Sequence, residues 1–140
     1  MMASRLNLLI AHADGSNWPN GLERALAPLP VRLLHSTDCD HAMGMAADPA
    51  VHVAIIDDAL PREGGLSVLR RLRSSGLTLP VLLVASELDR RLMEDAIQLN
   101  AFSVVAVDDR RDLVTPVVFR LVRQVYRVDW LYPGDSAMAN

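Results

Sequence analysis

Five short apolar segments recur along the chain, and most of them are apolar at successive positions rather than at alternate ones. Strands that are buried on both faces, as in a parallel sheet, have this pattern, whereas strands with one solvated face alternate. Each segment also has the usual length of a strand. The predicted strands are Leu6–Ala11, Val31–His35, Val51–Ile56, Val81–Ala85 and Val104–Val107.

Amphipathic segments alternate with these strands, and several of them have the end signals of helices. Pro19 suits the first turn of a helix that ends before Pro28. Asp38 or Asp40 is expected to cap the second helix. Gly76 is a natural stop after the third helix. The three signals place helices between the first four strands.

Two further signals predict the starts of the last two helices. Ser86 followed three residues later by Asp89 resembles a capping box, and we expect Ser86 to cap the fourth helix. Thr115 before Pro116 predicts the start of the fifth helix. Strict alternation of strands and helices with short connections predicts an α/β fold with right-handed crossovers and a doubly wound parallel sheet.

The stretch 51–73 reads VHVAIIDDALPREGGLSVLRRLR, and its spacing is specific. An apolar strand ends at Asp57, Pro61 follows four residues later and Gly65 eight residues later, and the amphipathic segment Leu66–Arg73 comes next. This stretch closely resembles the third strand, phosphoacceptor loop and third helix of response-regulator receiver domains, the CheY-like family. With the order of the elements, the resemblance covers roughly residues 5–130. It implies a flavodoxin-like (βα)5 fold, a five-stranded parallel sheet of order 2-1-3-4-5, and Asp57 as the phosphoacceptor.

A physical argument supports the importance of Asp57. Ligands of open parallel sheets bind outside the carboxyl ends of the strands, where Asp57 is predicted to lie. A carboxylate there has the chemistry of a nucleophile toward a phosphoryl group. The alternative is that Asp57 only ends a strand, since aspartate is a common turn residue.

Most of the groups that assist Asp57 in receivers are missing at the matching positions. Receivers use two acidic residues after the first strand to help bind Mg²⁺, and here His12 and Ala13 occupy those positions, with Asp14 next. Imidazole is a poor ligand for Mg²⁺, which prefers oxygen. We therefore expect Mg²⁺ binding to be weak or absent, with Asp57 and Asp14 as the remaining candidate ligands.

The switch hydroxyl and the lysine of receivers are also replaced. Ala85 stands at the hydroxyl position with Ser86 beside it, Val107 stands at the lysine position, and Asp108 follows it. Valine makes no hydrogen bond to phosphate, and Asp108 would repel it. The nearby cations that remain by sequence are expected to be solvated rather than to compensate: Arg62, Arg110 and Arg111.

Three hypotheses follow. The first is a degenerate receiver domain of a phosphorelay signalling protein that acts by protein interaction or dimerisation and is not an enzyme. The second is a phosphorylatable receiver with a rearranged site built from Asp14, Asp58 and Ser86, which would have a sensor kinase or phosphotransfer protein as its partner. The third is a small metal-binding α/β domain that uses His12 and Asp57, with Asp58 beside them.

The composition of the chain excludes some classes of function but does not decide among the three hypotheses. The net charge is -3 and no basic stripe stands out, which argues against nucleic acid binding. Arg70, Arg71 and Arg73 are interpreted as the solvated face of a helix. The single cysteine, Cys39, excludes an internal disulfide, and no apolar run has the length of a membrane span. These features suggest a cytoplasmic protein with no membrane contact.

The end of the chain offers a possible contact surface. The run from Val125 to Tyr132 is apolar on more than one side, which favours either dimerisation and contact with an output domain or ordinary packing against the first helix. Trp18 and Trp130 are interpreted as packing at the rim of the domain. We expect a receiver domain over residues 1–131 and a tail or linker over residues 132–140.

Overall fold

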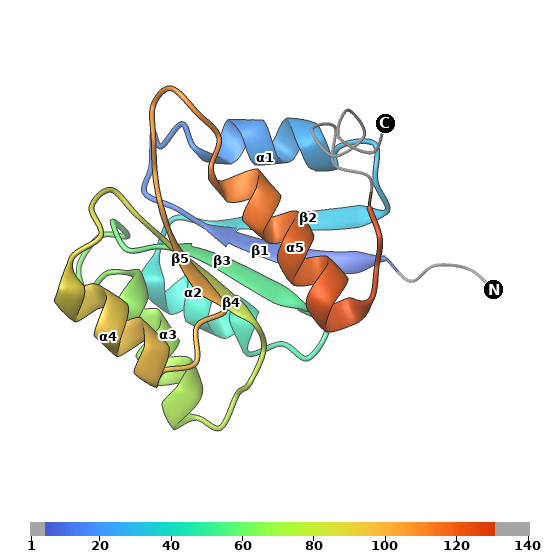
Figure 1. The fold of residues 1–140 in the computed structure, drawn as a ribbon. Coiled ribbons are helices and arrows are strands. Elements are labelled where there is room, and N and C mark those ends of the chain that lie inside the picture. Colours follow the sequence, from blue (N-terminus) through green and yellow to red (C-terminus); the bar gives the residue numbers. More distant parts are fainter. Residues whose placement is uncertain (1–4, 131–140) are drawn as a thin grey trace.

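The fold was analysed in a computed structural model, in which residues 5–130 are described. Strands and helices alternate along the whole of this range (Figure 1). The strands are β1 Leu6–Ala11, β2 Val31–Ser36, β3 Val53–Asp57, β4 Val81–Ala85 and β5 Ser103–Ala106. The helices are α1 Pro19–Leu26, α2 Cys39–Ala46, α3 Gly65–Ser74, α4 Arg90–Gln98 and α5 Val114–Tyr126.

The five strands form one parallel sheet in the order β2-β1-β3-β4-β5. This order and the (βα)5 alternation confirm the predicted flavodoxin-like fold. The order reverses at β1, because the chain first adds β2 on one side and then crosses over to add β3 on the other. The carboxyl ends of β1 and β3 are therefore neighbours, and a ligand site is expected between them.

Two apolar layers cover the sheet, one on each face (Figure 1). Leu8 and Ile10 of β1 face the layer that contains α1 and α5, whereas Leu9 and Ala11 face the layer that contains α2, α3 and α4. The same alternation holds in β3 and β4, where all five residues of each strand are buried. Burial on both faces is the reason why these strands are continuously apolar in the sequence.

The structure corrects the edges of three strands, of which β2 extends by one residue, to Ser36. Val51 was predicted to begin β3, but its backbone N–H donates to Asp48 O at 3.0 Å in a turn, and the ladder with β1 begins at Val53. β5 was predicted over Val104–Val107 and instead spans Ser103–Ala106. Val51 is apolar and buried without being in the sheet, so the apolar pattern alone extended the strand.

Two of the predicted helix caps are wrong. The side chain of Asp89, not of Ser86, accepts the backbone N–H of Leu92 at the start of α4. Asp112 fulfils the same function for α5, accepting from the backbone N–H groups of Val114 and Thr115. In each helix an aspartate just before the first turn performs the capping function that the sequence analysis had assigned to a hydroxyl side chain.

Asp38 is the residue that caps α2, as one of the two predicted alternatives. It accepts from the backbone N–H of His41 at 2.9 Å. This hydrogen bond lowers the pKa of the Asp38 carboxyl below its usual value. Pro19 at the first position of α1 and the left-handed Gly76 after α3 are confirmed as the start and stop signals that the sequence indicated.

The last helix ends at Tyr126, where Arg127 adopts a left-handed conformation with φ 58°. The apolar run beyond it turns back onto the domain. Tyr126 donates to His52 O at 2.6 Å, and Trp130 packs edge-on against Phe119 with ring centroids 5.5 Å apart. Tyr126, Val128 and Trp130 therefore pack within the domain, whereas Val125 is 43% exposed. The rest of the run, and the predicted tail over 132–140, lie outside the described residues.

Arg73 is not part of a solvated helix face, contrary to the sequence interpretation. Its guanidinium donates to three backbone carbonyls, at 2.7 Å to Leu99 O, 2.8 Å to Leu77 O and 3.2 Å to Asn100 O. Burial lowers the pKa of this guanidinium below its usual value. The side chain thus ties the α3–β4 connection to the end of α4. No helix within residues 5–130 is long and apolar enough to span a membrane.

We predict that Arg73→Ala destabilises the domain by about 2–3 kcal/mol, because three carbonyls lose a charged donor. Urea unfolding followed by circular dichroism measures the change. Arg70→Ala is the matched control on the same helix, because Arg70 is more than half exposed and reaches Asp95 only at 4.0 Å. We expect the control to cost less than about 0.5 kcal/mol. Equal losses for the two variants would contradict this assignment.

Candidate functional site

The centre of the site is Asp57, the last residue of β3. It pairs in register with Val84 of the neighbouring strand β4, and only 4% of its surface is exposed. Because it alternates with Val53 and Ile55, its side chain points to the face covered by α1 and α5. The structure therefore places a buried carboxylate at the carboxyl end of the sheet, beside the point where the strand order reverses.

Two N–H groups hold this carboxylate. The indole Nε1–H of Trp18 donates to Oδ2 at 2.7 Å, and the backbone N–H of Ala59 donates to Oδ1 at 2.8 Å. Both oxygens thus have a donor, one from the residue that precedes α1 and one from the loop after β3. The two oxygens of this buried side chain are thus satisfied by hydrogen bonds, as buried polar groups in folded proteins generally are.

The role of Trp18 was missed in the sequence, where it was interpreted as packing at the rim. It immediately precedes Pro19, the first residue of α1, and α1 starts at the same edge of the sheet at which Asp57 lies. That placement is the one signal in the sequence that would have brought the two together. A tryptophan also needs an acceptor for its N–H when it is partly buried, and a nearby carboxylate provides one.

The loop after Asp57 depends on two glycines. Gly64 has φ +84°, a conformation that favours glycine, and a Cβ on Gly65 would lie 2.5 Å from the backbone oxygen of Asp57. Asp58 points away from Asp57 and accepts from the backbone N–H of Leu66 at 3.1 Å, at the start of α3. The glycine eight residues after Asp57 is thus required by close backbone approach.

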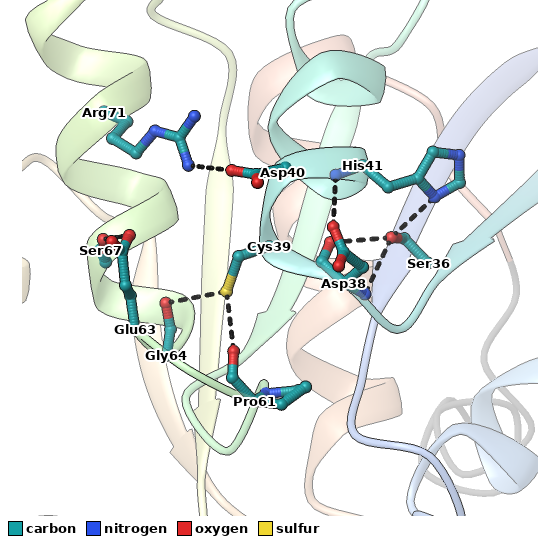
Figure 2. A network of polar contacts seen from close by, with 10 residues as sticks. All are labelled: Ser36, Asp38, Cys39, Asp40, His41, Pro61, Glu63, Gly64, Ser67 and Arg71. Carbon is teal, nitrogen blue, oxygen red and sulfur yellow. Dashed lines mark hydrogen bonds and ion pairs between the residues drawn. The ribbon is translucent and has the colours of Figure 1, made fainter.

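Cys39 holds the same loop from the other side (Figure 2). Its thiol donates to the backbone oxygens of Pro61 at 3.4 Å and Gly64 at 3.7 Å, so the start of α2 contacts the loop after β3. The neighbouring polar contacts are local: His41 Nδ1 lies 2.9 Å from Ser36 Oγ, and Arg71 pairs with Asp40 at 2.9 Å. This network supports the loop that presents Asp57 and does not itself reach the carboxylate.

The side chains of His12 and Asp14, at and beside the acidic-pair positions, form no hydrogen bond with Asp57. The backbone N–H of His12 donates to Ser36 O at 2.9 Å, which continues the ladder with β2. The His12 ring lies edge-on to His35, with centroids 5.9 Å apart, and edge-on to Trp18 at 6.4 Å. Asp14 is exposed in the loop that follows. His12 thus belongs to an aromatic cluster at the ends of β1 and β2.

The switch and lysine positions offer no polar side chain toward the site. Ala85 is buried and Ser86 is exposed. Val107 packs into the apolar layer of α1 and α5, and its backbone N–H donates to Ala85 O at 2.8 Å. Asp108 accepts from the backbone N–H of Arg110 at 2.7 Å, and this hydrogen bond lowers the pKa of its carboxyl.

None of the ion pairs within residues 5–130 includes Asp57. Of the three arginines considered by sequence, Arg111 pairs with Asp108 at 3.4 Å, and Arg62 and Arg110 are exposed. In the same part of the chain, no group of three or more His, Cys, Asp or Glu side chains has an arrangement that could hold a metal ion. The described residues therefore give no support to the hypothesis of a metal cluster of His12, Asp57 and Asp58.

The donor set at Asp57 does not fit Mg²⁺. This ion requires a near-octahedral shell of oxygens, usually from one or two carboxylates and water. Here one oxygen of Asp57 faces the Trp18 N–H and the other faces the Ala59 N–H, and both donors would be repelled by a cation. The positions that supply further carboxylates in receivers are His12 and Ala13.

No protein-family model matches the sequence, and the search of curated proteins also gives no match. Solved structures do match. The signal receiver domain of the response regulator NarL from Mycobacterium tuberculosis has a TM-score of 0.70 with 21% identity, covering 86% of this chain and 98% of that one. This chain has the fold of response-regulator receiver domains.

Two further receiver domains have a similar structure. The signal receiver domain of an HD domain-containing protein from Pseudomonas fluorescens has a TM-score of 0.72 with 21% identity, covering 88% of this chain and 95% of that one. The receiver domain of a LuxO repressor protein from Vibrio parahaemolyticus has a TM-score of 0.70 with 20% identity and the same two coverages, 88% and 95%. The receiver fold thus accounts for nearly the whole length of these domains.

The hydrogen bond between Trp18 and Asp57 can be tested by NMR, because the chain has only two tryptophans. We predict that Asp57→Asn moves the indole proton signal of Trp18 upfield and speeds its exchange with solvent, because a neutral acceptor binds the proton less strongly. The indole signal of Trp130, which packs against Phe119, is the internal control and should not move. A Trp18 signal that is insensitive to Asp57→Asn would show that this contact is not formed.

A second prediction concerns the glycine beneath Asp57. Gly65→Ala is expected to destabilise the domain by about 3 kcal/mol or more, since the new methyl group meets the Asp57 backbone, which cannot move without disturbing β3. Gly44→Ala in α2 is the matched control, because nothing lies within 4 Å of its added Cβ. It should stabilise the helix by about 0.5–1 kcal/mol. Chemical unfolding of both variants decides between these expectations.

Proposed function

We propose that this chain is a receiver-type domain of a two-component or phosphorelay signalling protein that works by protein interaction, without phosphorylation of Asp57. The observation that supports this most directly is the pair of N–H donors on the Asp57 carboxylate. They occupy both oxygens in a site that lacks the cations used for phosphoryl transfer. The domain keeps the receiver fold, but two uncharged N–H donors contact the Asp57 carboxylate in place of cations.

Electrostatics explains why this site is unsuited to phosphorylation. Phosphoryl transfer depends on positive charge around the transferred group, from a metal ion and a lysine or arginine. Removing one such stabilising group typically costs about 3 kcal/mol of transition-state stabilisation. At the lysine position Val107 is apolar, and Asp108 next to it adds negative charge. The nucleophilic oxygen is in addition held by the Trp18 indole.

The alternative site built from Asp14, Asp58 and Ser86 receives little support from the geometry. Asp58 accepts a backbone N–H from α3, on the opposite side of β3 from the Asp57 carboxylate. Asp14 and Ser86 are both exposed, in different loops. For this reason we propose the degenerate receiver. Phosphorylation of Asp57 in the experiment below would instead favour the rearranged site.

We propose that the partner is a protein, either an output domain or a second copy of the chain, rather than nucleic acid. The apolar run after α5 is largely turned back onto the domain, which weakens the prediction that it forms the contact. Among the described residues, Ile97 of α4 is 70% exposed and is the most exposed large apolar side chain, with Leu88 at 44% and Val125 at 43%. A partner contact would therefore use α4 as well as α5.

The direct test is incubation with acetyl phosphate and Mg²⁺, followed by intact-mass measurement and NMR. We predict that the wild-type domain gains no stoichiometric phosphoryl group and that the residues of β4 show no shift. Beryllofluoride with Mg²⁺ should likewise leave the Ala59 amide signal in place. The Asp57→Asn variant is the blank for modification elsewhere in the chain.

The same experiment on a reconstructed variant tests why Asp57 is not phosphorylated. His12→Asp, Ala13→Asp and Val107→Lys together restore the acidic and lysine positions, and Trp18→Phe removes the indole donor. If the proposal is right, modification rises only in the reconstructed variant, provided that circular dichroism shows it to be folded. Stoichiometric modification of the wild type at Asp57 would overturn the proposal.

A further inference from the structure

A polar cavity of about 510 Å³ lies between the start of α1 and the loop that connects β5 to α5. These two segments lie side by side at the carboxyl end of the sheet (Figure 1). Its size falls within the range of about 300–1,000 Å³ typical of small-molecule sites. Its position agrees with the general rule that ligands of parallel sheets bind outside the carboxyl ends of the strands.

Trp18 is the aromatic wall of this cavity and also a contact of Asp57. Trp18 is one of the residues that line the cavity, and its Nε1–H donates to Asp57 Oδ2. The hydrogen bond fixes the orientation of the indole, so the ring is presented to the cavity in one position. A planar aromatic ligand can stack on such a fixed ring, which is worth about 0.5–1.5 kcal/mol beyond the burial of surface.

The charges that line the cavity divide into engaged and unengaged groups. Arg111 pairs with Asp108, and Asp112 accepts the first N–H groups of α5. Among the described residues, by contrast, no hydrogen bond or ion pair involves the side chains of Arg24 and Arg110. Two exposed arginines whose side chains are not engaged elsewhere in the described chain thus line one cavity.

Further polar groups that line the cavity are also unengaged. The side-chain amides of Asn17 and Asn20 and the carboxylate of Asp109 form no hydrogen bond with other residues of the described chain. The amides both donate and accept, and the carboxylate accepts. The lining therefore offers an aromatic face, two cations for an oxyanion, and acceptors for hydroxyl or amino groups.

From this combination we propose that the cavity binds a mononucleotide. The phosphate lies on the guanidinium groups of Arg24 and Arg110, which match the geometry of phosphate oxygens. The base stacks on Trp18, and its polar edge and the ribose hydroxyls contact the asparagines and Asp109. Because the same indole holds Asp57, binding is coupled to the Asp57 contact without any phosphorylation of the protein.

The test is titration of the wild-type domain with AMP and, separately, with GMP, followed by the two indole signals in NMR. We expect a saturable shift of the Trp18 indole signal with at least one nucleotide at up to millimolar concentration, while the Trp130 signal stays in place. Inorganic phosphate is the probe for a simple anion site. It should bind at least about tenfold more weakly, because it lacks the stacking and hydrogen-bonding groups.

Matched variants locate the site. Arg24→Gln and Arg110→Gln should each weaken nucleotide binding by about tenfold, the loss of one charge-assisted contact. Arg123→Gln on the exposed face of α5, outside the cavity lining, is the control and should leave binding unchanged. The proposal is overturned if neither nucleotide gives a saturable shift of Trp18, if Arg24→Gln and Arg110→Gln bind as the wild type does, or if inorganic phosphate binds as tightly as the nucleotides.

Discussion

The carboxylate of Asp57 is 96% removed from solvent, so neighbouring groups must replace the hydrogen bonds that it would form with water. The arrangement of the site depends on which groups do this. An uncompensated buried charge costs several kcal/mol, which is a large fraction of the stability of a domain of this size. A cation would be the usual solution. Here a tryptophan N–H and a backbone N–H provide it instead, at 2.7 and 2.8 Å.

This solution links parts of the chain that are far apart in sequence. The indole comes from the residue that precedes α1, and the backbone donor comes from the loop after β3. That loop is held in place by the close approach of Gly65 to the Asp57 backbone and by the thiol of Cys39 on α2. Residues from both helical layers thus support the two N–H groups that contact Asp57. Trp18, which provides one of them, also lines the neighbouring cavity.

Much of the fold was predictable because local signals agreed with one another. Continuous apolar strands indicated a parallel sheet, and Pro19 and Gly76 marked helix ends where the structure has them. Asp57 and Gly65 were found through the resemblance of their stretch to receiver domains, and the structure adds the physical reason for the glycine, which is its close approach to the Asp57 backbone. Predictions of this kind rest on short-range constraints that are written into a few neighbouring residues.

The errors arose where the deciding contact is distant or where two local signals compete. Trp18 lies 39 residues from Asp57, and no periodicity reports that pairing. Arg73 was placed on a solvated face because its three carbonyl partners belong to segments that only the tertiary fold brings near. For the helix caps, Asp89 and Asp112 take the place of Ser86 and Thr115, because α4 begins only at Arg90 and α5 already at Val114, so neither hydroxyl residue stands at the capping position.

The central claim is that hydrogen-bond donors, and not a metal ion, stabilise the Asp57 carboxylate. The most direct measurement is titration of the domain with Mn²⁺, a paramagnetic substitute for Mg²⁺, followed by broadening of individual NMR signals. Our account predicts that at millimolar Mn²⁺ the signals of the Trp18 indole and the Ala59 amide broaden no more than those of exposed acidic loops elsewhere. Selective, saturable broadening of these two signals that is lost in Asp57→Asn would contradict it.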